Sequence, residues 1–271
     1  MIKQAIIPLA GLGTRLLPLT SVIPKELLPI NGRAGIEYIL DECTKSGIKE
    51  IIFIISKKKE IIKDYFFKDS FYKKLIKKKK NNKKLKIEYK KIQKYKKMIK
   101  FVYQNKPHGT GDAILKCKKY ITSKHFLMLL PDDLIIKKNC SKELIKLHNK
   151  NPVSFIASKK VNKKDVSRWG ILKIKKNKKN IFNIVDVIEK PPIISAPSNY
   201  AVIGRYILPY EIFNILQKQK KGQNGELHIT DAIKTLILRG SKFFGYIFSG
   251  EYLDCGTLNG YIKSNLKISK L

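Results

Sequence analysis

The chain has 271 residues, 43% of them hydrophobic, which is enough to bury a full core in one large α/β domain or two small ones. No apolar run approaches the roughly 20 residues that a membrane-spanning helix needs, which argues against an integral membrane protein. The first residues lead directly into an apolar strand, and the four cysteines lack CxxC spacing. We therefore expect a reduced, cytoplasmic protein without a signal peptide, disulfide framework or zinc site.

The formal net charge of +36 comes almost entirely from lysine, since only five of the 57 basic residues are arginine. Proteins that read bases or grip nucleic-acid phosphates favour arginine for its planar, bidentate fork. We therefore interpret the excess as solvated surface lysine and expect no specific nucleic-acid partner. The most basic stretch, residues 73–100, is predicted to form one or two charged surface helices with a turn near Asn81 and Asn82.

Strand and helix patterns alternate along the first half of the chain. Apolar runs predict strands at residues 4–9, 51–55, 99–103 and 126–130. Between them we expect a helix at 35–46 that ends at Gly47, a helical region from 56 to about 97, and a helix at 111–120. This alternation is typical of a doubly wound parallel sheet.

After Asp133 the pattern changes to that of a mixed sheet. Strands are predicted at 153–158, 170–175, 181–188, 200–207 and 242–248, with helices at about 210–217, 230–238 and 258–266. No internal repeat or long linker divides the chain. The predicted fold class is a single α/β domain, residues 1–271, with a mixed, mostly parallel central sheet flanked by helices. Its second half, 134–271, caps the first, 1–133.

The loop after the first strand reads "AGLGTR" and lies at the carboxyl end of that strand, where open α/β sheets bind ligands. It matches neither the P-loop GxxxxGK[ST] nor the dinucleotide fingerprint GxGxxG. The backbone N–H groups around Gly11, Gly13 and Thr14 can form a nest for phosphate oxygens, beside which Arg15 and Lys25 supply two cations. This arrangement fits a triphosphate; the alternative is a glycine turn with solvated cations.

The longer pattern GxGTRxxP followed by PKExLP resembles the signature of the nucleoside-diphosphate-sugar pyrophosphorylases, and most closely the bacterial type that joins UTP to glucose 1-phosphate. Further matches follow in order along nearly the whole chain: "ECTKSGIKEI", "GTGDA", "LPDD", "WGIL", "IEKP", "NYAVIGRYIL", "GELHITDAI" and "DCGT". The resemblance implies a Rossmann-like nucleotidyltransferase fold with a nucleotide-binding first half and a sugar-binding second half. It also implies formation of UDP-glucose and pyrophosphate, with a homodimer or homotetramer as the assembly.

The resemblance also implies roles for the charged residues. Arg15 would hold the outgoing pyrophosphate, and Lys25 would neutralise the α-phosphate as charge builds. Asp132 follows an apolar strand, so its carboxylate is well placed for Mg²⁺, and Asp254 is similar to the second metal ligand of the family. The alternative for Asp132 is a helix or turn cap. Asp133 would face the other way and has no assigned role.

The sugar side of the reaction is assigned to a second group of residues by the same resemblance. Glu189 would accept hydrogen bonds from the sugar hydroxyls, and Lys190 would bind the sugar phosphate. Since neighbouring strand residues point to opposite faces, this pair must lie where the strand ends. Gly170 and Gly204 would let the backbone approach the sugar closely, although plain strand bulges would explain them too.

Base choice is assigned to Gln104, which resembles the uracil-contacting glutamine of the family, with help from Gly109 and the backbone of Ala10 and Gly11. One departure is Asp112 in "GTGDA", where some relatives carry a histidine, and we expect it to alter metal or phosphate contacts.

Three other functions stay open. The chain fits a dTTP-using relative less well, because such proteins usually show SKQLLP. A nucleic-acid-binding protein built on this fold should lose affinity steeply with salt. A degenerate, regulatory paralogue is disfavoured because the charged motif residues are all present.

The lysine excess should also make any homo-oligomer salt-sensitive, because like-charged subunits repel one another at low salt.

Overall fold

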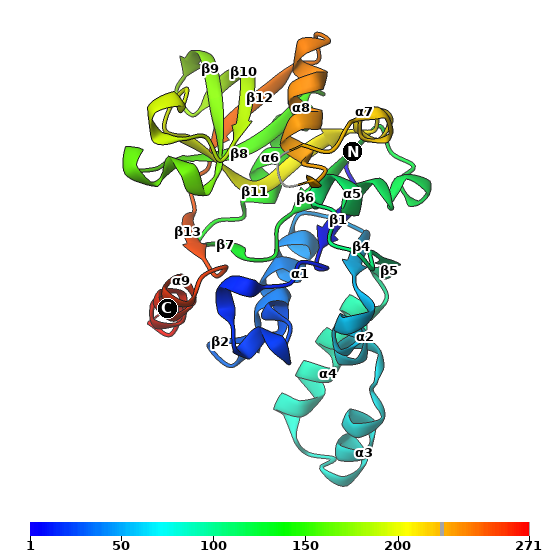
Figure 1. Ribbon diagram of the computed structural model, residues 1–271. Coiled ribbons are helices and arrows are strands. Elements are labelled where there is room, and N and C mark those ends of the chain that lie inside the picture. Colours follow the sequence, from blue (N-terminus) through cyan, green and yellow to red (C-terminus); the bar gives the residue numbers. More distant parts are fainter. Residues whose placement is uncertain (223–224, 271) are drawn as a thin grey trace.

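One mixed β-sheet runs through the computed structural model, which describes residues 1–222 and 225–270 (Figure 1). Within these residues the sheet has nine strands in the order β5-β4-β1-β6-β11-β8-β12-β10-β9. In that order they span Ile99–Tyr103, Glu50–Ile55, Gln4–Pro8, His125–Leu129, Tyr200–Pro209, Ser154–Lys160, Phe243–Ile247, Ile181–Glu189 and Gly170–Lys178. Strands from both halves of the chain therefore share one hydrogen-bonded sheet.

The direction of the strands changes in the middle of the sheet. β5, β4, β1 and β6 are parallel to one another, as the alternating pattern predicts. β11 then lies antiparallel between β6 and β8, and the β12–β10 and β10–β9 pairs are antiparallel too, while β8 and β12 are parallel. The sheet is mixed as expected, but it is not mostly parallel: its continuous parallel part ends at β6, where the antiparallel strand β11 follows, and beyond it, among the described strands, only β8 and β12 pair in parallel.

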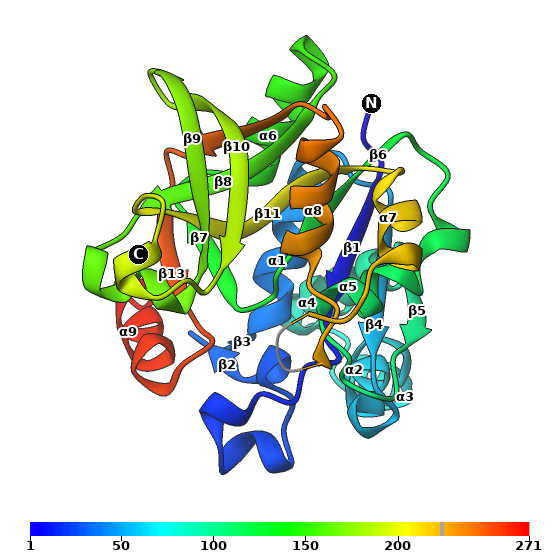
Figure 2. The same ribbon diagram turned by 45° about the horizontal axis from the view of Figure 1, so that its top comes forward.

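Helices cover both faces of the sheet (Figure 2). Side chains of α1, α2, α4 and α6 join one core cluster, and those of α5, α7 and α8 join the cluster on the opposite face. These seven helices span Gly35–Lys45, Glu60–Phe67, Lys83–Lys96, Cys140–Lys150, Thr110–Leu115, Ile212–Lys218 and Ile229–Leu238, respectively. The predicted helix at 111–120 is thus shorter, and a 3₁₀ turn at Lys118–Tyr120 follows it.

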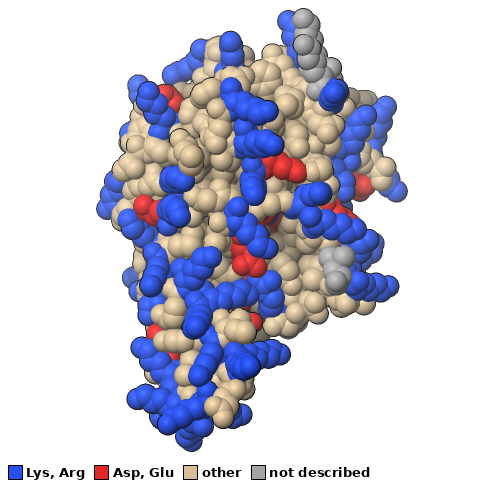
Figure 3. All heavy atoms as spheres, turned by 180° about the vertical axis from the view of Figure 1, so that it is seen from behind, with Lys and Arg blue, Asp and Glu red and all other residues tan. Residues whose placement is uncertain are grey.

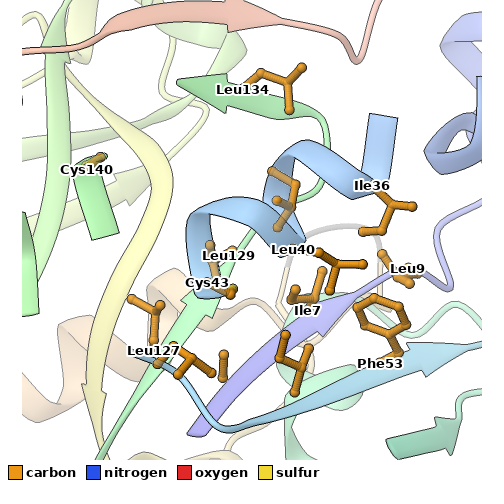
Figure 4. Close-up of a cluster of buried hydrophobic side chains, with 14 of the residues drawn as sticks. Ile7, Leu9, Ile36, Leu40, Cys43, Phe53, Leu127, Leu129, Leu134 and Cys140 are labelled. Carbon is orange, nitrogen blue, oxygen red and sulfur yellow. The ribbon is translucent and has the colours of Figure 1, made fainter. Parts of the chain in front are cut away.

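The central strands alternate between the two clusters. Ile7 and Phe53 pack on the face of α1, where they lie close to Ile36 and Leu40 (Figure 4). Their neighbour Ile6 belongs to the opposite cluster. Because side chains alternate along a strand, a continuous apolar run of this kind buries both faces of a strand at once.

Several short elements are absent from the sequence-based prediction. Helix α6 begins at Cys140, and the side chain of Asn139 caps it by accepting from the N–H of Lys142 at 2.8 Å. Its apolar spacing is obscured by lysines in the sequence.

Two small antiparallel pairs also form: β2 (Pro29–Ile30) with β3 (Arg33–Ala34), and β7 (Asp133–Ile136) with β13 (Glu251–Asp254). The C-terminal helix α9 spans Leu258–Ile268.

The basic stretch forms an arm that projects from the body of the molecule (Figure 1). The stretch includes all of α4 and most of α3 (Ser70–Lys78), a helix that has no buried residue. The predicted turn is confirmed: Asn82 caps α4 by accepting from the N–H of Leu85 at 2.9 Å. Lysines cover the arm in the rear view (Figure 3). No helix in the described ranges has the length and apolar character needed to cross a membrane.

A fully buried ion pair links the two halves of the chain. Arg205 in β11 donates to both carboxylate oxygens of Glu42 in α1, at 2.9 and 2.8 Å, and its side chain is 0% exposed. Its Nη1 also donates to the carbonyl oxygens of Gly204 at 2.9 Å and Leu130 at 3.2 Å. The carboxylate of Glu42 further accepts from the N–H of Ser141 at 3.0 Å, so one charge pair fixes α1, α6 and the end of β6 together.

Substituting Arg205 by Met should lower the free energy of unfolding by about 3–5 kcal/mol, because the Glu42 carboxylate stays buried without its cation. The double variant Glu42→Met/Arg205→Met should lose less than the two single variants together. Urea denaturation of all three measures this, with Lys68→Met as the control for an exposed ion pair. Strictly additive losses would contradict the assignment.

A histidine pair lies at the edge of the core, where the rings of His125 and His148 have centroids 4.6 Å apart. Burial and the neighbouring His148 lower the pKa of His125 below its ordinary value of 6.5, against the opposing charge of Glu211. His125 therefore binds a proton more weakly in the folded chain than in the unfolded one.

We expect the free energy of unfolding to fall as the pH drops below about 6.5, because the unfolded chain then takes up the proton on His125 first. Urea midpoints measured on a pH series from about 7.5 to 5.5 test this. His125→Gln should flatten that dependence, and an equal slope in the variant would count against the histidine as its source.

Candidate functional site

A cavity of about 510 Å³ opens at the carboxyl ends of β1, β5, β6 and β10. It is lined by residues from both halves of the chain. All predicted site residues except Gly204 lie on its wall: Ala10, Gly11, Gly13, Thr14, Arg15, Lys25, Gln104, Gly109, Asp132, Gly170, Glu189, Lys190 and Asp254. The cavity is therefore large enough for a small phosphorylated ligand, and cations and carboxylates both face it.

The glycine loop turns sharply at Gly13, whose φ of 72° is left-handed. The carbonyl oxygen of Gly13 accepts from Oγ1 of Thr20 at 2.8 Å, and the next three residues form a 3₁₀ turn, Thr14–Leu16. This turn holds Arg15 at the rim of the cavity, where its side chain is 62% exposed. Arg15 is thus positioned to meet an anion that enters from solvent.

Lys25 lies deeper. It opens the 3₁₀ turn Lys25–Leu27, and its Nζ lies 2.6 Å from Oδ2 of Asp132, while Nη2 of Arg15 lies 3.6 Å from the same oxygen. Burial lowers the pKa of Lys25, but the charges of Asp132 and Glu26 outweigh it and the pKa is raised. Burial raises the pKa of Asp132, and Lys25 more than reverses this. Both groups are therefore charged near neutral pH.

A second buried pair fixes the turn that carries Lys25. Both carboxylate oxygens of Glu26 accept from Nζ of Lys59, at 3.0 and 2.8 Å, and the same Nζ donates to the carbonyl oxygen of Leu9 at 2.7 Å. The burial of Lys59 lowers its pKa, although Glu26 opposes the shift. The end of β1 and the lysine turn are thus held by one ammonium group.

Asp254 reaches the cavity through the β7–β13 pair, in which it lies opposite Asp133. Its Oδ2 accepts from Nη2 of Arg168 at 2.9 Å, and its Oδ1 accepts from the N–H of Gly256 at 2.9 Å. A Cβ atom at Gly256 would lie 2.7 Å from Oδ2 of Asp132 and 3.2 Å from Oδ1 of Asp254. The two carboxylates and the guanidinium of Arg15, whose Nη2 would lie 3.0 Å from that Cβ, therefore face one small space that glycine keeps open.

This space has the chemistry that suits Mg²⁺, which binds one or two carboxylates and takes its other ligands from phosphates and water. Asp132 and Asp254 supply two such carboxylates, and in the described part of the chain no group of three metal-ligating His, Cys, Asp or Glu side chains occurs. The donor set is accordingly incomplete for an all-protein site and fits a metal that arrives with a phosphate ligand.

Gly204 differs from its prediction. It is buried in β11, and its N–H donates to Oδ2 of Asp133 at 2.8 Å. A Cβ atom there would lie 2.5 Å from Cβ of Leu130 and 2.6 Å from that carboxylate oxygen. Asp133 also accepts from the hydroxyl of Tyr252 at 2.7 Å, and burial, with the charge of Asp132, raises its pKa to about 6. Gly204 is thus needed for close packing behind the cavity, and not for contact with its contents.

Glu189 and Lys190 share the cavity although they are adjacent. β10 ends at Glu189, as predicted, and Lys190 adopts a left-handed φ of 43°, which turns the chain out of the strand. Oε2 of Glu189 accepts from the hydroxyl of the buried Thr230 at 3.1 Å. A Cβ atom at Gly170 would lie 3.2 Å from the same oxygen, so this glycine gives the carboxylate room.

Gln104 follows β5 and is almost fully buried. Its Nε2 donates to the carbonyl oxygen of Gly109 at 3.2 Å and to Oδ2 of Asp112 at 2.6 Å. Gly109 has a φ of 97°, and a Cβ atom there would lie 2.6 Å from the carbonyl oxygen of Leu227. Asp112 therefore contacts the glutamine, whereas we expected an effect on metal or phosphate contacts.

Four further site residues escaped the sequence analysis: Lys59, Arg168, Thr230 and Gly256. Lys59 is one of three consecutive lysines, so the sequence does not show which of them is buried. Thr230 lies in the motif "GELHITDAI", and Arg168 directly precedes "WGIL", where the scarcity of arginine in the chain is a usable signal. Gly256 follows Asp254 in "DCGT", and its role depends on tertiary contacts that spacing does not report.

The fold and the site together define a nucleotidyltransferase: a cation-lined glycine loop at the carboxyl ends of parallel strands, facing two carboxylates. The chain matches the family model described as "Nucleotidyl transferase" over residues 4–270, and it belongs to that family.

Named relatives match nearly the whole chain. A Mycoplasma pneumoniae protein named UTP–glucose-1-phosphate uridylyltransferase is 38% identical over 98% of this chain and 91% of its own length. A Methanocaldococcus jannaschii protein named putative UTP–glucose-1-phosphate uridylyltransferase is 35% identical over 99% of this chain and 93% of its own.

Solved structures agree with this placement. A UDP-glucose pyrophosphorylase complexed with UDP-glucose has a TM-score of 0.89 and 34% identity, covering 100% of this chain and 99% of that chain. A UTP-bound enzyme of the same kind from Acinetobacter baumannii has a TM-score of 0.88 and 32% identity, covering 99% and 93%. The Rossmann-like nucleotidyltransferase fold is thereby confirmed.

Proposed function

We propose that this protein transfers the uridylyl group of UTP to glucose 1-phosphate, giving UDP-glucose and pyrophosphate. The observation that carries the proposal is the buried Lys25, held 2.6 Å from Asp132 on the wall of a cavity that Arg15, Glu189 and Lys190 also line. The names of the relatives, which share more than a third of their residues with this chain, point to the same reaction.

In this mechanism an oxygen of the sugar phosphate attacks the α-phosphorus in line. The new O–P bond forms as the bond between the α-phosphorus and the pyrophosphate oxygen breaks. Such a step requires mainly positioning and charge neutralisation. Lys25, held in a water-poor position, neutralises the α-phosphate where charge develops, and Arg15 at the rim holds the departing pyrophosphate.

Glu189 and Lys190, which line the same cavity, position the acceptor. Lys190 binds the phosphate of glucose 1-phosphate, and Glu189 accepts hydrogen bonds from the sugar hydroxyls. Thr230 fixes the Glu189 carboxylate by donating to Oε2, which leaves the other oxygen, 3.8 Å from Nζ of Lys190, to meet the sugar. A sugar that lacks the matching hydroxyl would leave this carboxylate unpaired.

The metal in this proposal is Mg²⁺, which Asp132 and Asp254 would hold across the space that Gly256 leaves open. When bound, the ion supplies positive charge to the triphosphate oxygens. Arg168, which pairs with Asp254 at 2.9 Å, must then share or release that carboxylate.

We further propose that the protein forms a homodimer or homotetramer and that it works in the cytoplasm. The four cysteines are free and buried, as suits a reducing compartment.

Pyrophosphate release from glucose 1-phosphate and UTP tests the reaction. The protein should release pyrophosphate with UTP, and Lys25→Met should lower kcat about 100- to 1000-fold, because it removes a preorganised charge from the transition state. Lys68→Met, an exposed lysine on the arm side, is the matched control and should keep full activity. Absence of release with UTP, or equal activity of both variants, would overturn the proposal.

Gly256→Ala tests the metal site. Its methyl group would enter the space between the two carboxylates, so Mn²⁺ binding in the presence of UTP, followed by electron paramagnetic resonance, should weaken about tenfold or more. The circular dichroism spectrum and melting temperature should stay close to those of the unsubstituted protein. Unchanged Mn²⁺ affinity in a folded variant would show that the metal lies elsewhere.

A further inference from the structure

The side-chain amide of Gln104 is held in one orientation by its neighbours. Both of its hydrogen bonds run from Nε2: to Oδ2 of Asp112 at 2.6 Å and to the carbonyl oxygen of Gly109 at 3.2 Å. A carbonyl oxygen only accepts, and an ionised carboxylate only accepts. The amide therefore cannot turn over without placing its own oxygen against two acceptors.

Asp112 is the stronger of these two constraints. A hydrogen bond to a charged acceptor is roughly twice as strong as one between neutral groups, and the short distance to Asp112 fits this. Asp112 lies in the first turn of α5, where a negative charge is favourable. Its other oxygen lies 3.5 Å from Nζ of Lys116, one helical turn away.

The consequence is that Gln104 offers the cavity an acceptor only, since both hydrogens of Nε2 are used. Backbone donors line the same cavity: within the described chain, the N–H groups of Gly11 and Gly109 donate to no other group. A cavity wall that offers one side-chain acceptor together with backbone N–H donors has the groups that an imide edge requires, in which an N–H lies between two carbonyl oxygens.

We propose that Asp112 is a specificity-determining residue that fixes the amide of Gln104 so that the site takes nucleotides with an imide edge and rejects cytosine. The inference rests on the proposed function for the identity of the ligand. Uracil presents N3–H to Oε1 of Gln104. Cytosine presents a lone pair at N3, which opposes the oxygen, and an amino group where the site offers a donor.

Calorimetric titration with UTP, dTTP and CTP, without sugar phosphate, tests the inference independently of turnover. The unsubstituted protein should bind UTP at least about tenfold more tightly than CTP. Asp112→Asn can present a donor to a turned amide, which leaves the carbonyl oxygen of Gly109 as the one remaining acceptor that holds Gln104, so the UTP-to-CTP affinity ratio should fall at least about threefold. The UTP-to-dTTP ratio should not change, because thymine has the same imide edge.

Lys116→Met is the matched control: it removes the ion partner of Asp112 but keeps the carboxylate, so all three affinities should keep their ratios. Asp112→Ser, whose hydroxyl also both donates and accepts, replaces Asp112→Asn if the latter does not fold. A UTP-to-CTP ratio that is unchanged in the Asp112 variants would overturn the inference. Failure of the proposed function is distinguishable, because it would appear as missing pyrophosphate release in the unsubstituted protein.

Discussion

The contact between Nζ of Lys25 and Oδ2 of Asp132, 2.6 Å long, is the constraint around which the site is built. An ammonium group buried this far from water is costly unless an opposite charge lies beside it. Asp132 meets that requirement in the absence of a ligand, and Arg15 shares the same oxygen at 3.6 Å. The site therefore brings two cations to one carboxylate oxygen, and the burial of Lys25 depends on that carboxylate.

Two further buried ion pairs, Lys59 with Glu26 and Arg205 with Glu42, stabilise different segments around this contact. Lys59 and Glu26 fix the turn that presents Lys25, and they tie it to the carbonyl oxygen of Leu9, the residue after β1. Arg205 and Glu42 fix the end of β6 from behind, through the carbonyl oxygen of Leu130. Because each pair bridges segments distant in sequence, they favour the one tertiary arrangement in which no partner is left unpaired. Replacing any single member of a pair should therefore destabilise the fold, because the remaining charge stays buried without its partner.

The predictable part of the site lies at the ends of strands. The runs before Ala10, Gln104 and Asp132 are apolar and strand-like, so the positions of these residues follow from strand order and the rule that ligands bind at carboxyl ends. Asp254 reaches the site on β13, a four-residue strand that pairs with β7. Its place in the site could be predicted only from the family resemblance, because so short a strand leaves almost no periodic signal in the sequence.

The roles of Gly204 and Gly256 could not be predicted from the sequence either. Each sits where a Cβ atom would meet a carboxylate oxygen, of Asp133 in one case and Asp132 in the other. Composition shows that a glycine is present, but only the folded contacts show whether it gives room to a ligand or to the protein itself. The helix α6 was missed for a related reason, since lysines fill its solvent face and dilute the apolar spacing of Leu144 and Ile145.

The lysine excess acts on this site at a distance. With a formal net charge of +36, the molecule attracts a triphosphate from any direction, and low ionic strength extends that attraction to about 30 Å. The same field opposes the departure of pyrophosphate, and it gives no preference among nucleoside triphosphates, which carry equal charge. Selection of the base must therefore come from the uncharged parts of the cavity wall. Under the proposed function, surface lysines would raise the encounter rate, Lys25 and Arg15 would bind the phosphates, and the amide of Gln104 with its backbone neighbours would choose the base.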